Sequence, residues 1–322
     1  MATRVPLIFG TMTFGHPGKN GVRTDTLQEC QEILDVFHKH GGKEVDTARM
    51  YAEGTTEEVL SQLDLHGATV DTKVYPVEAG DHHPDKLKAT FEVSLQKLGK
   101  IKPRVLYLHA PDRSVPFEDT VAAIDELYKQ GKFEIFGLSN YAAWEVAEIV
   151  GICKVKGYVQ PKIYQAMYNA VTRAIEEELV PCLRKYNIRL VVYNPLAGGY
   201  LAGKISTSNI PEGRFGGESA MAKMYRARYI HQGYADALEA IREAADKHQL
   251  RLTEVALRWV QHHSVLTPAD GVILGASSAQ QLEENCIDRH VVSAKGPLPQ
   301  DIVEALDLAW SKVGMNCPKY WR

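Results

Sequence analysis

The sequence lacks several features that mark particular classes of protein. Its 322 residues contain no apolar run approaching the ~20 residues of a membrane span, and the N-terminus MATRVPLIFG has no stretch typical of a secretory signal. No Asn-x-Ser/Thr sequon occurs. The five cysteines are scattered, odd in number and free of any C-x-x-C spacing, which indicates thiols in a reducing compartment. These absences predict a soluble, cytoplasmic protein.

Charge of either sign is nowhere concentrated. The formal net charge is −3, and neither a basic stripe nor a long run of like charges is present. Nucleic acid and anionic membranes are therefore poor candidates for partners. The sequence also lacks a G-x-G-x-x-G motif, which disfavours a doubly wound dinucleotide-binding sheet.

What the sequence does contain is a regular alternation of strand and helix patterns. Several strand candidates are apolar on consecutive residues, as expected of parallel strands buried on both faces. We predict strands at 6–12, 43–48, 70–75, 105–110, 133–139, 162–168, 189–195 and 271–277. We predict helices at 24–40, 56–65, 84–99, 117–130, 141–153, 175–187, 233–249, 253–263, 278–288 and about 299–313, with Thr24 as the first N-cap.

Eight strands alternating with helices predict a single α/β domain, a (β/α)8 barrel spanning residues 1–322. A long loop is expected at about 203–232, after the seventh strand, and would lie on the functional face of the barrel. The C-terminal tail follows the last helix and could fold back over the same mouth.

Polar residues recur at the C-terminal ends of six successive predicted strands, where barrels carry their functional sites. A single Asp or His at a strand end more often caps a turn, but the joint pattern favours a functional site. The residues are Asp46, Lys73, His109, Ser139 with Asn140, Gln165, and Tyr193 with Asn194.

Tyr51 stands five positions after Asp46, just past the end of the second strand. A tyrosine has an unperturbed pKa of about 10 and donates protons poorly near neutrality, but a nearby ammonium such as that of Lys73 favours its phenolate. Asp46 could hold Lys73 in place, and His109 could hydrogen-bond the same substrate oxygen. The group would then form a tuned acid that faces a polarised carbonyl.

D-T-A-x-x-Y, followed by a lysine on the next strand, L-H, G-L-S-N and a strand glutamine, resembles the aldo-keto reductase superfamily. NPLAGGYLAGK (194–204), GRF (213–215), ILGASSAQQLEEN (273–285) and CPKYWR (317–322) resemble the branch of aflatoxin-aldehyde and succinic-semialdehyde reductases. The resemblance implies an NADPH-dependent reductase of aldehydes or ketones, of use in detoxification, with a tetrad of Tyr51, Asp46, Lys73 and His109. The branch is often dimeric, which would make a second copy of the chain a partner.

The same resemblance implies an NADP(H) site. Ser139, Asn140 and Gln165 would hold the carboxamide of the nicotinamide, and Tyr193 would stack on its ring. The segment 194–204 nearly spells a P-loop, but its last position is Ile205, which cannot coordinate magnesium. Its small residues and Lys204 instead suit a pyrophosphate. The residues expected to bind the cofactor here are Asn194, Pro195, Leu196, Ala197, Gly198, Leu201, Lys204 and Arg214.

The segment after the eighth strand opens a helix, and helix N-termini bind anions. The residues expected to bind the cofactor there are Gly275, Ser277, Ser278, Gln281, Glu284 and Asn285. Much of the superfamily carries a lysine and an arginine for the 2′-phosphate where this chain has Gly275 and Gln281. The sequence therefore does not decide whether NADP is strictly preferred over NAD. Arg214 is the candidate for a positive charge that replaces the missing lysine and arginine at the 2′-phosphate.

The resemblance also implies a substrate site made of His109, Tyr225, Arg228 and Arg322. Two guanidiniums over an apolar pocket would suit an aldehyde with a remote carboxylate. Two other functions stay open. One is a nucleotide-binding regulatory subunit like the potassium-channel β-subunits of the superfamily. The other is a metal-dependent barrel hydrolase, although the first strand lacks the H-x-H pair that such enzymes use; we expect no metal.

Overall fold

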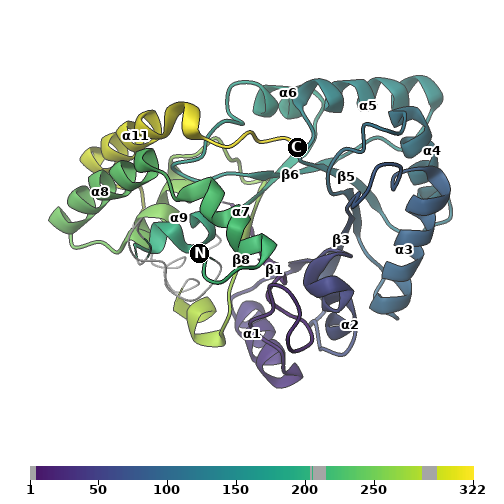
Figure 1. The fold of residues 1–322 in the computed structure, drawn as a ribbon, viewed down its shortest axis with the longest axis horizontal. Helices are drawn as coiled ribbons and strands as arrows, with labels where there is room; N and C mark the ends of the chain where they lie inside the picture. Colours follow the sequence, from purple (N-terminus) through teal and green to yellow (C-terminus); the bar gives the residue numbers. More distant parts are fainter. Residues whose placement is uncertain (1–4, 204, 206–214, 285–295) are drawn as a thin grey trace.

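The computed structural model describes residues 5–203, 205, 215–284 and 296–322. Eight parallel strands close into a barrel in sequence order, so the predicted (β/α)8 fold is confirmed (Figure 1). Except for the third, the strands are shorter than predicted, because the regular pairing covers only part of each predicted run. They are β1 (Leu7–Gly10), β2 (Glu44–Asp46), β3 (Thr69–Val74), β4 (Val105–Leu108), β5 (Ile135–Ser139), β6 (Ile163–Met167), β7 (Arg189–Tyr193) and β8 (Gly271–Gly275).

The interior of the barrel is apolar on one side and charged on the other. Alternate side chains of each strand point inward, and those of β1, β4, β6, β7 and β8 form a compact apolar cluster of Ile8, Val105, Tyr107, Ile163, Val191 and Ile273. Gly137 on β5 leaves room for the Tyr107 ring, which an added Cβ would strike. Strands β2 and β3 instead bury the charged side chains of Asp46, Asp71 and Lys73.

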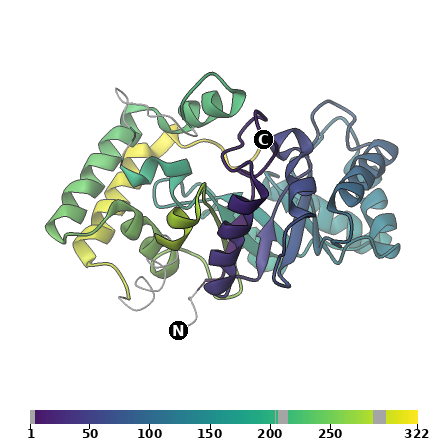
Figure 2. The same cartoon turned by 90° about the horizontal axis from the view of Figure 1, so that it is seen from below.

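Helices surround the barrel, and those with a clear apolar face, such as the first and the fourth, turn it toward the strands. They are α1 (Leu27–Lys39), α2 (Thr56–Leu60), α3 (Pro84–Leu98), α4 (Phe117–Lys129), α5 (Ala143–Lys156), α6 (Leu179–Lys185), α7 (Ala220–Tyr229), α8 (Gln232–Lys247), α9 (Leu252–His262) and α11 (Gln300–Val313). Short 3-10 turns lie at η1 (Tyr51–Gly54), η2 (Ala197–Ala202) and η3 (Gly314–Asn316). Helices α8 and α11 lie side by side on one flank (Figures 1 and 2).

The structure corrects four local predictions. The N-cap of α1 is Thr26, whose hydroxyl accepts from the amide of Glu29, and not Thr24. The expected loop 203–232 contains a helix, α7, which begins after the capping side chain of Ser219. Helix α6 begins at Leu179 rather than 175, since turns occupy 174–178. The adjacent residues His82 and His83 are predicted to be polar surface residues rather than a metal site, because neighbouring residues on a helix point about 100° apart. His82 is instead buried against α4.

The C-terminal tail returns to the mouth of the barrel, as predicted. The backbone amide of Arg322 donates to the carbonyl of Asn140, just past β5, over 3.0 Å. The chain therefore ends over the strands rather than beside them, and Figure 2 shows the C-terminus at the edge of the barrel beside the N-terminal strand and helix. Within the described residues, no helix has the length and hydropathy needed to cross a membrane.

Candidate active site

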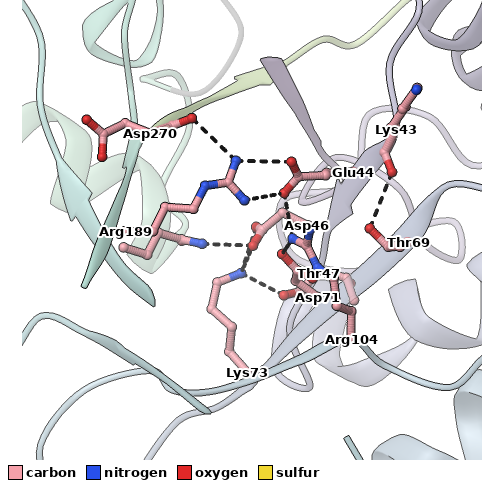
Figure 3. Close-up of polar contacts among 11 residues, drawn as sticks. Lys43, Glu44, Asp46, Thr47, Thr69, Asp71, Lys73, Arg104, Arg189 and Asp270 are labelled. Carbon is pink, nitrogen blue, oxygen red and sulfur yellow. Dashed lines mark hydrogen bonds and ion pairs between the residues drawn. The ribbon is translucent and has the colours of Figure 1, made fainter. Parts of the chain in front are cut away.

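A buried ion pair lies at the centre of the mouth. The Lys73 ammonium donates to both carboxylate oxygens of Asp46, each over 2.7 Å, and to the carbonyl of Thr47 over 2.6 Å (Figure 3). The side chain of Lys73 is fully buried and that of Asp46 is 3% exposed. Burial raises the pKa of Asp46 and lowers the pKa of Lys73, and the attraction between the two groups opposes both shifts. All three hydrogen-bond donors of the Lys73 ammonium are thus directed toward acceptors at and just after the end of β2.

The Lys73 ammonium also lies beside Tyr51, which begins the turn η1 after β2. Its nitrogen is 5.0 Å from the centre of the Tyr51 ring. On the other side, the Tyr51 ring meets the His109 ring edge-on, with 6.0 Å between the ring centres. The structure thus brings the four predicted tetrad residues together from β2, η1, β3 and the end of β4.

His109 is held as a neutral imidazole. Burial lowers the pKa of His109 well below its usual value, and the charges of Lys73 and Arg322 lower it further. Among the described residues, its Nδ1 has no hydrogen-bond partner. A neutral imidazole can still donate one hydrogen bond to a ligand, because one of its two ring nitrogens keeps its proton.

The residues expected at the nicotinamide lie next to the tetrad. Asn140 donates to Ser139 Oγ over 3.0 Å and to the His109 carbonyl over 2.8 Å. The Tyr193 hydroxyl donates to the Asn140 side chain over 3.1 Å. Gln165 donates to Asp46 over 2.8 Å, a contact that the sequence did not reveal. Gln165 thus also braces the carboxylate that holds Lys73.

The segment after β7 provides a close approach for a ligand. Backbone φ is positive at Asn194, Ala197, Gly198 and Gly199, with values of 61°, 50°, 70° and 106°. Gly199 has no neighbour within 4 Å of an added Cβ. The buried side-chain nitrogen of Asn194, Nδ2, has no partner among the described residues. A bare backbone and an unused donor fit a phosphate-bearing cofactor. Pro195, Ala197 and Leu201 are buried and Leu196 is partly buried.

The second expected cofactor segment follows β8. Ser277 donates through its amide (2.8 Å) and hydroxyl (3.1 Å) to the side chain of Gln281, and the Ser278 hydroxyl accepts from the Gln281 amide over 3.1 Å. Gly275, Gln281 and Glu284 are exposed. The predicted helix 278–288 is helical at 279–284. Lys204, Arg214 and Asn285, three expected contacts, lie outside the described residues.

The tail and α7 place two arginines near the mouth. The Arg322 guanidinium lies over the Tyr75 ring, 5.8 Å from its centre, and approaches Met224 at 3.8 Å. Burial would lower the pKa of Arg322, but the phenols of Tyr193, Tyr75 and Tyr51 raise it. Arg322 is therefore close to the tetrad, as the sequence predicts. Tyr75, two residues after Lys73 and 5.5 Å from the His109 ring, was not predicted.

Arg228 and Tyr225 reach the same region from α7. The Arg228 guanidinium is 5.7 Å from the centre of the Tyr225 ring, and the Tyr225 hydroxyl donates to Asn194 over 3.1 Å. Burial raises the pKa of Tyr193, and the charges of Arg228 and Arg322 oppose that shift. Both arginines therefore act on one phenol at the mouth, beside a tyrosine that is already engaged with the β7 loop.

A second buried charge cluster closes the other end of the barrel. Arg189 donates to Glu44 over 2.8 and 3.0 Å, and Arg104 bridges Glu44 and Asp71 (Figure 3). Burial would raise the pKa of Glu44, but Arg189 and Arg104 lower it. We call Glu44, Asp71, Arg104 and Arg189 the floor cluster. Its charges balance, and it lies on the face opposite to the strand ends that carry the tetrad.

Comparison with known proteins agrees with this geometry. The aldo/keto reductase family model matches residues 6–307. Aflatoxin B1 aldehyde reductase member 2 of Mus musculus is 40% identical over 99% of this chain and 88% of the relative. Aldo-keto reductase family 7 member A3 of Homo sapiens is 41% identical, over 90% and 91%. An aldo-keto reductase of Pseudocercospora fijiensis is 43% identical, over 90% and 100%.

A parallel barrel with this extent of similarity is an oxidoreductase of the kind that generally uses a nicotinamide cofactor. The chain belongs to the aldo/keto reductase family. The family resemblance of its motifs, including the branch that they indicate, is thereby confirmed.

Proposed function

We propose that the protein reduces aldehydes to alcohols with NADPH as the reductant. One observation carries the proposal: the Lys73 ammonium, held by Asp46 over 2.7 Å, lies 5.0 Å from the centre of the Tyr51 ring at the barrel mouth. A fixed positive charge beside a phenol favours the phenolate and so makes the phenol a better acid. The relatives named as aldehyde reductases support the same activity.

Each residue has a distinct part in the proposed reaction. Tyr51 donates its phenolic proton to the carbonyl oxygen, and the resulting phenolate is stabilised by Lys73 and regains a proton from solvent. His109, neutral because of its burial, donates a hydrogen bond to the same oxygen and orients the carbonyl. Asp46, braced by Gln165, keeps Lys73 in place. NADPH, when bound, supplies the hydride for the carbonyl carbon.

The cofactor would be held by the residues that surround this centre. Ser139, Asn140 and Gln165 offer hydroxyl and amide groups to a carboxamide, and Tyr193 offers a ring face. The bare backbone at Gly199 suits the pyrophosphate, and Ser277, Ser278 and Gln281 suit the 2′-phosphate. We expect NADPH to bind more tightly than NADH, and separate titrations with the two cofactors test that preference.

The substrate would be an aldehyde that carries a remote carboxylate. Arg322 and Arg228 both act electrostatically on Tyr193, so their charges converge on one side of the mouth. A guanidinium binds a carboxylate through paired hydrogen bonds. An aldehyde group could then reach Tyr51 and His109 while its acid group meets the arginines, with Tyr225 and Tyr75 along the path.

The deciding experiment is NADPH oxidation by the isolated protein against a panel of aldehydes, half of them bearing a carboxylate. We expect turnover with both halves and lower KM values for the carboxylates. Tyr51→Phe is the blank, since it keeps the ring and removes the acid. A protein that binds NADPH tightly but oxidises it with none of the aldehydes would instead favour the regulatory-subunit alternative.

A further inference from the structure

The turn that carries Tyr51 has an unusual backbone. Ala52, Glu53 and Gly54 are three consecutive residues with positive φ, at 48°, 55° and 90°. Non-glycine residues disfavour this left-handed conformation, and a run of three persists only where the surroundings impose it. The position of the Tyr51 phenol is therefore set by whatever holds this turn.

The side chain of Arg49 holds the turn from inside. It donates to the carbonyl of Gly54 and forms an ion pair with Glu57, so that one guanidinium spans the turn. A Cβ added at Gly54 would strike the same guanidinium. The backbone and Arg49 are thus in direct contact at the last left-handed residue. The planar fork of the guanidinium holds these two acceptors in a fixed geometry, which the flexible, non-planar donor of a lysine would not reproduce.

Glu57 ties this clamp to the strand that carries Lys73. Its side chain is fully buried and accepts a hydrogen bond from Thr72 Oγ1 over 2.6 Å. Thr72 immediately precedes Lys73 on β3. The backbone amide of Arg49 also donates to the carbonyl of Lys73 over 3.0 Å. One chain of contacts therefore runs from Gly54 through Arg49 and Glu57 to β3.

We propose that Arg49 and Glu57 are positioning residues, which fix the distance between the Tyr51 phenol and the Lys73 ammonium. Within the described part of the chain, neither side chain contacts a residue that is expected to bind the cofactor or the substrate. They act by holding the turn of Tyr51 against the strand of Lys73. The inference rests on the proposed function, because the spacing matters for a proton donor tuned by Lys73.

Other contacts hold the outer side of the turn and give a contrast. Thr56 Oγ1 donates to the carbonyl of Phe14 over 2.7 Å, and the His16 amide donates to Thr55 Oγ1 over 3.1 Å. These bonds join the turn to the segment after β1. They do not link it to β3. The Arg49–Glu57 pair provides the side-chain link between the turn and β3, in addition to the backbone bond from Arg49 to Lys73.

The test separates position from stability. Arg49→Met leaves Glu57 buried and unpaired, which should lower Tm as well as kcat. The double variant Arg49→Met with Glu57→Met replaces the pair by apolar side chains of similar size, which should recover most of the Tm. Because the bond to Gly54 is still lost, kcat should stay about 10- to 100-fold below wild type, the cost of a misplacement near 1 Å. KM and the NADPH dissociation constant should change little.

Two further variants make the result specific. Arg49→Lys keeps the charge opposite Glu57 but loses the fork, so its Tm should exceed that of Arg49→Met while kcat stays below wild type. Arg184→Met is the matched control. It breaks the pair of Arg184 with the buried Asp270, at 2.6 and 2.8 Å, far from the mouth. It should lower Tm and leave kcat unchanged at temperatures where the protein is folded.

A wild-type kcat in the double variant would overturn the proposal, as would a kcat that follows Tm across all four variants. A separate signal does not require turnover: the ¹³Cζ resonance of Tyr51, assigned with Tyr51→Phe, should move in the double variant and not in Arg184→Met. If that resonance moves while the wild type reduces no aldehyde, the proposed function fails and the positioning role stands. If the resonance is unchanged, the positioning role fails.

Discussion

The floor cluster and the tetrad are two groups of charges in one barrel, and they differ in where their unpaired polar atoms lie. In the floor cluster, Glu44 and Asp71 receive hydrogen bonds from Arg104 and Arg189, and Nε of Arg189 has no partner among the described residues. At the mouth, Lys73 is saturated by three contacts, whereas His109 Nδ1 and Asn194 Nδ2 have no partner among the described residues. Carboxylates that are all paired with arginines serve the fold, while unused polar atoms beside a fixed charge at the strand ends are available to ligands.

The two groups are adjacent, which makes the difference informative. Asp46 and Asp71 face each other in register across β2 and β3. Asp71 meets an arginine and Asp46 meets a lysine. Burial raises the pKa of Asp71 to about 6 although Arg104 opposes it, so even a carboxylate paired with an arginine is costly to bury. The ends of the same two strands thus serve opposite purposes, which mutations should separate.

The largest effect is expected at the mouth. Tyr51→Phe removes the proton donor and should lower kcat by about 10²–10⁴-fold, with Tm and NADPH affinity almost unchanged. Steady-state kinetics together with thermal unfolding measure both quantities. Near-normal turnover in this variant would show that another group donates the proton.

Lys73→Met tests the charge rather than the donor. The variant should lose turnover and shift the limb of the pH–rate profile that reports proton donation toward the ordinary tyrosine value of about 10. Asp46→Asn should be milder, because Lys73 remains but is less firmly held. An active Lys73→Met enzyme with an unchanged pH–rate profile would exclude the tuning role.

Much of the barrel could be predicted from the sequence, because buried parallel strands appear as short apolar runs and their polar ends mark one face. Asp46, Lys73 and His109 were found in this way. The contact of Gln165 with Asp46 could not be, since it crosses the barrel between β6 and β2 and no local pattern encodes it. Arg49 and Glu57, eight positions apart, resemble an ordinary surface pair in the sequence.

The sequence prediction also missed helix α7, but for the opposite reason, because here a local signal was present and weak. Its residues AMAKMYRARY lack a clear apolar face, so the segment resembled a loop. The available clue was Ser219, whose side chain caps the helix by accepting from the Ala222 amide over 3.1 Å. Recognising that cap would have placed Tyr225 and Arg228 on one helix.

The floor cluster should show the reverse of the mouth. Arg189→Met leaves Glu44 with one fewer partner and should destabilise the fold by about 3 kcal/mol or less, since Arg189 is still 23% exposed. Because no atom of Arg189 reaches the tetrad, kcat should be unchanged wherever the variant is folded. Chemical unfolding and kinetics on the same preparation test this prediction. A variant that kept its stability but lost kcat would contradict it, and would show that the floor cluster contributes to turnover.

Acid should lower the stability of the fold through His82, which is 1% exposed. Burial lowers the pKa of His82 to about 4. The unfolded chain, with a histidine pKa of about 6.5, therefore binds the proton first, and stability present above pH ~6.5 is lost as the pH falls toward ~4, by at most about 3 kcal/mol. His82→Gln should flatten that dependence. His83→Gln, at the exposed neighbouring position, should leave it unchanged; an equal effect in both would refute the assignment.

The smallest effects concern substrate choice and the tail. Arg228→Ala, or deletion of Arg322, should raise KM for a carboxylate-bearing aldehyde such as succinic semialdehyde. If the lost contact is a charged hydrogen bond, the rise should correspond to a loss of about 1.5–3 kcal/mol of binding free energy. A neutral aromatic aldehyde should be little affected. If both substrates suffered equally, the arginines would order the mouth and would not recognise an anion.

Tyr320 gives a finer version of the same test, because it fixes the tail without reaching the mouth. Its hydroxyl donates to Glu178 over 2.6 Å and accepts from the Ala143 amide over 3.1 Å, two residues before Arg322. Tyr320→Phe keeps the buried ring but loses both bonds, at a cost of about 1 kcal/mol each. The tail should then hold Arg322 less firmly, so KM should rise only for the carboxylate-bearing aldehyde and by less than in the Arg322 deletion. In a background that already lacks Arg322, the same substitution should have no further effect on KM, and an additional rise there would mean that Tyr320 acts through another part of the mouth.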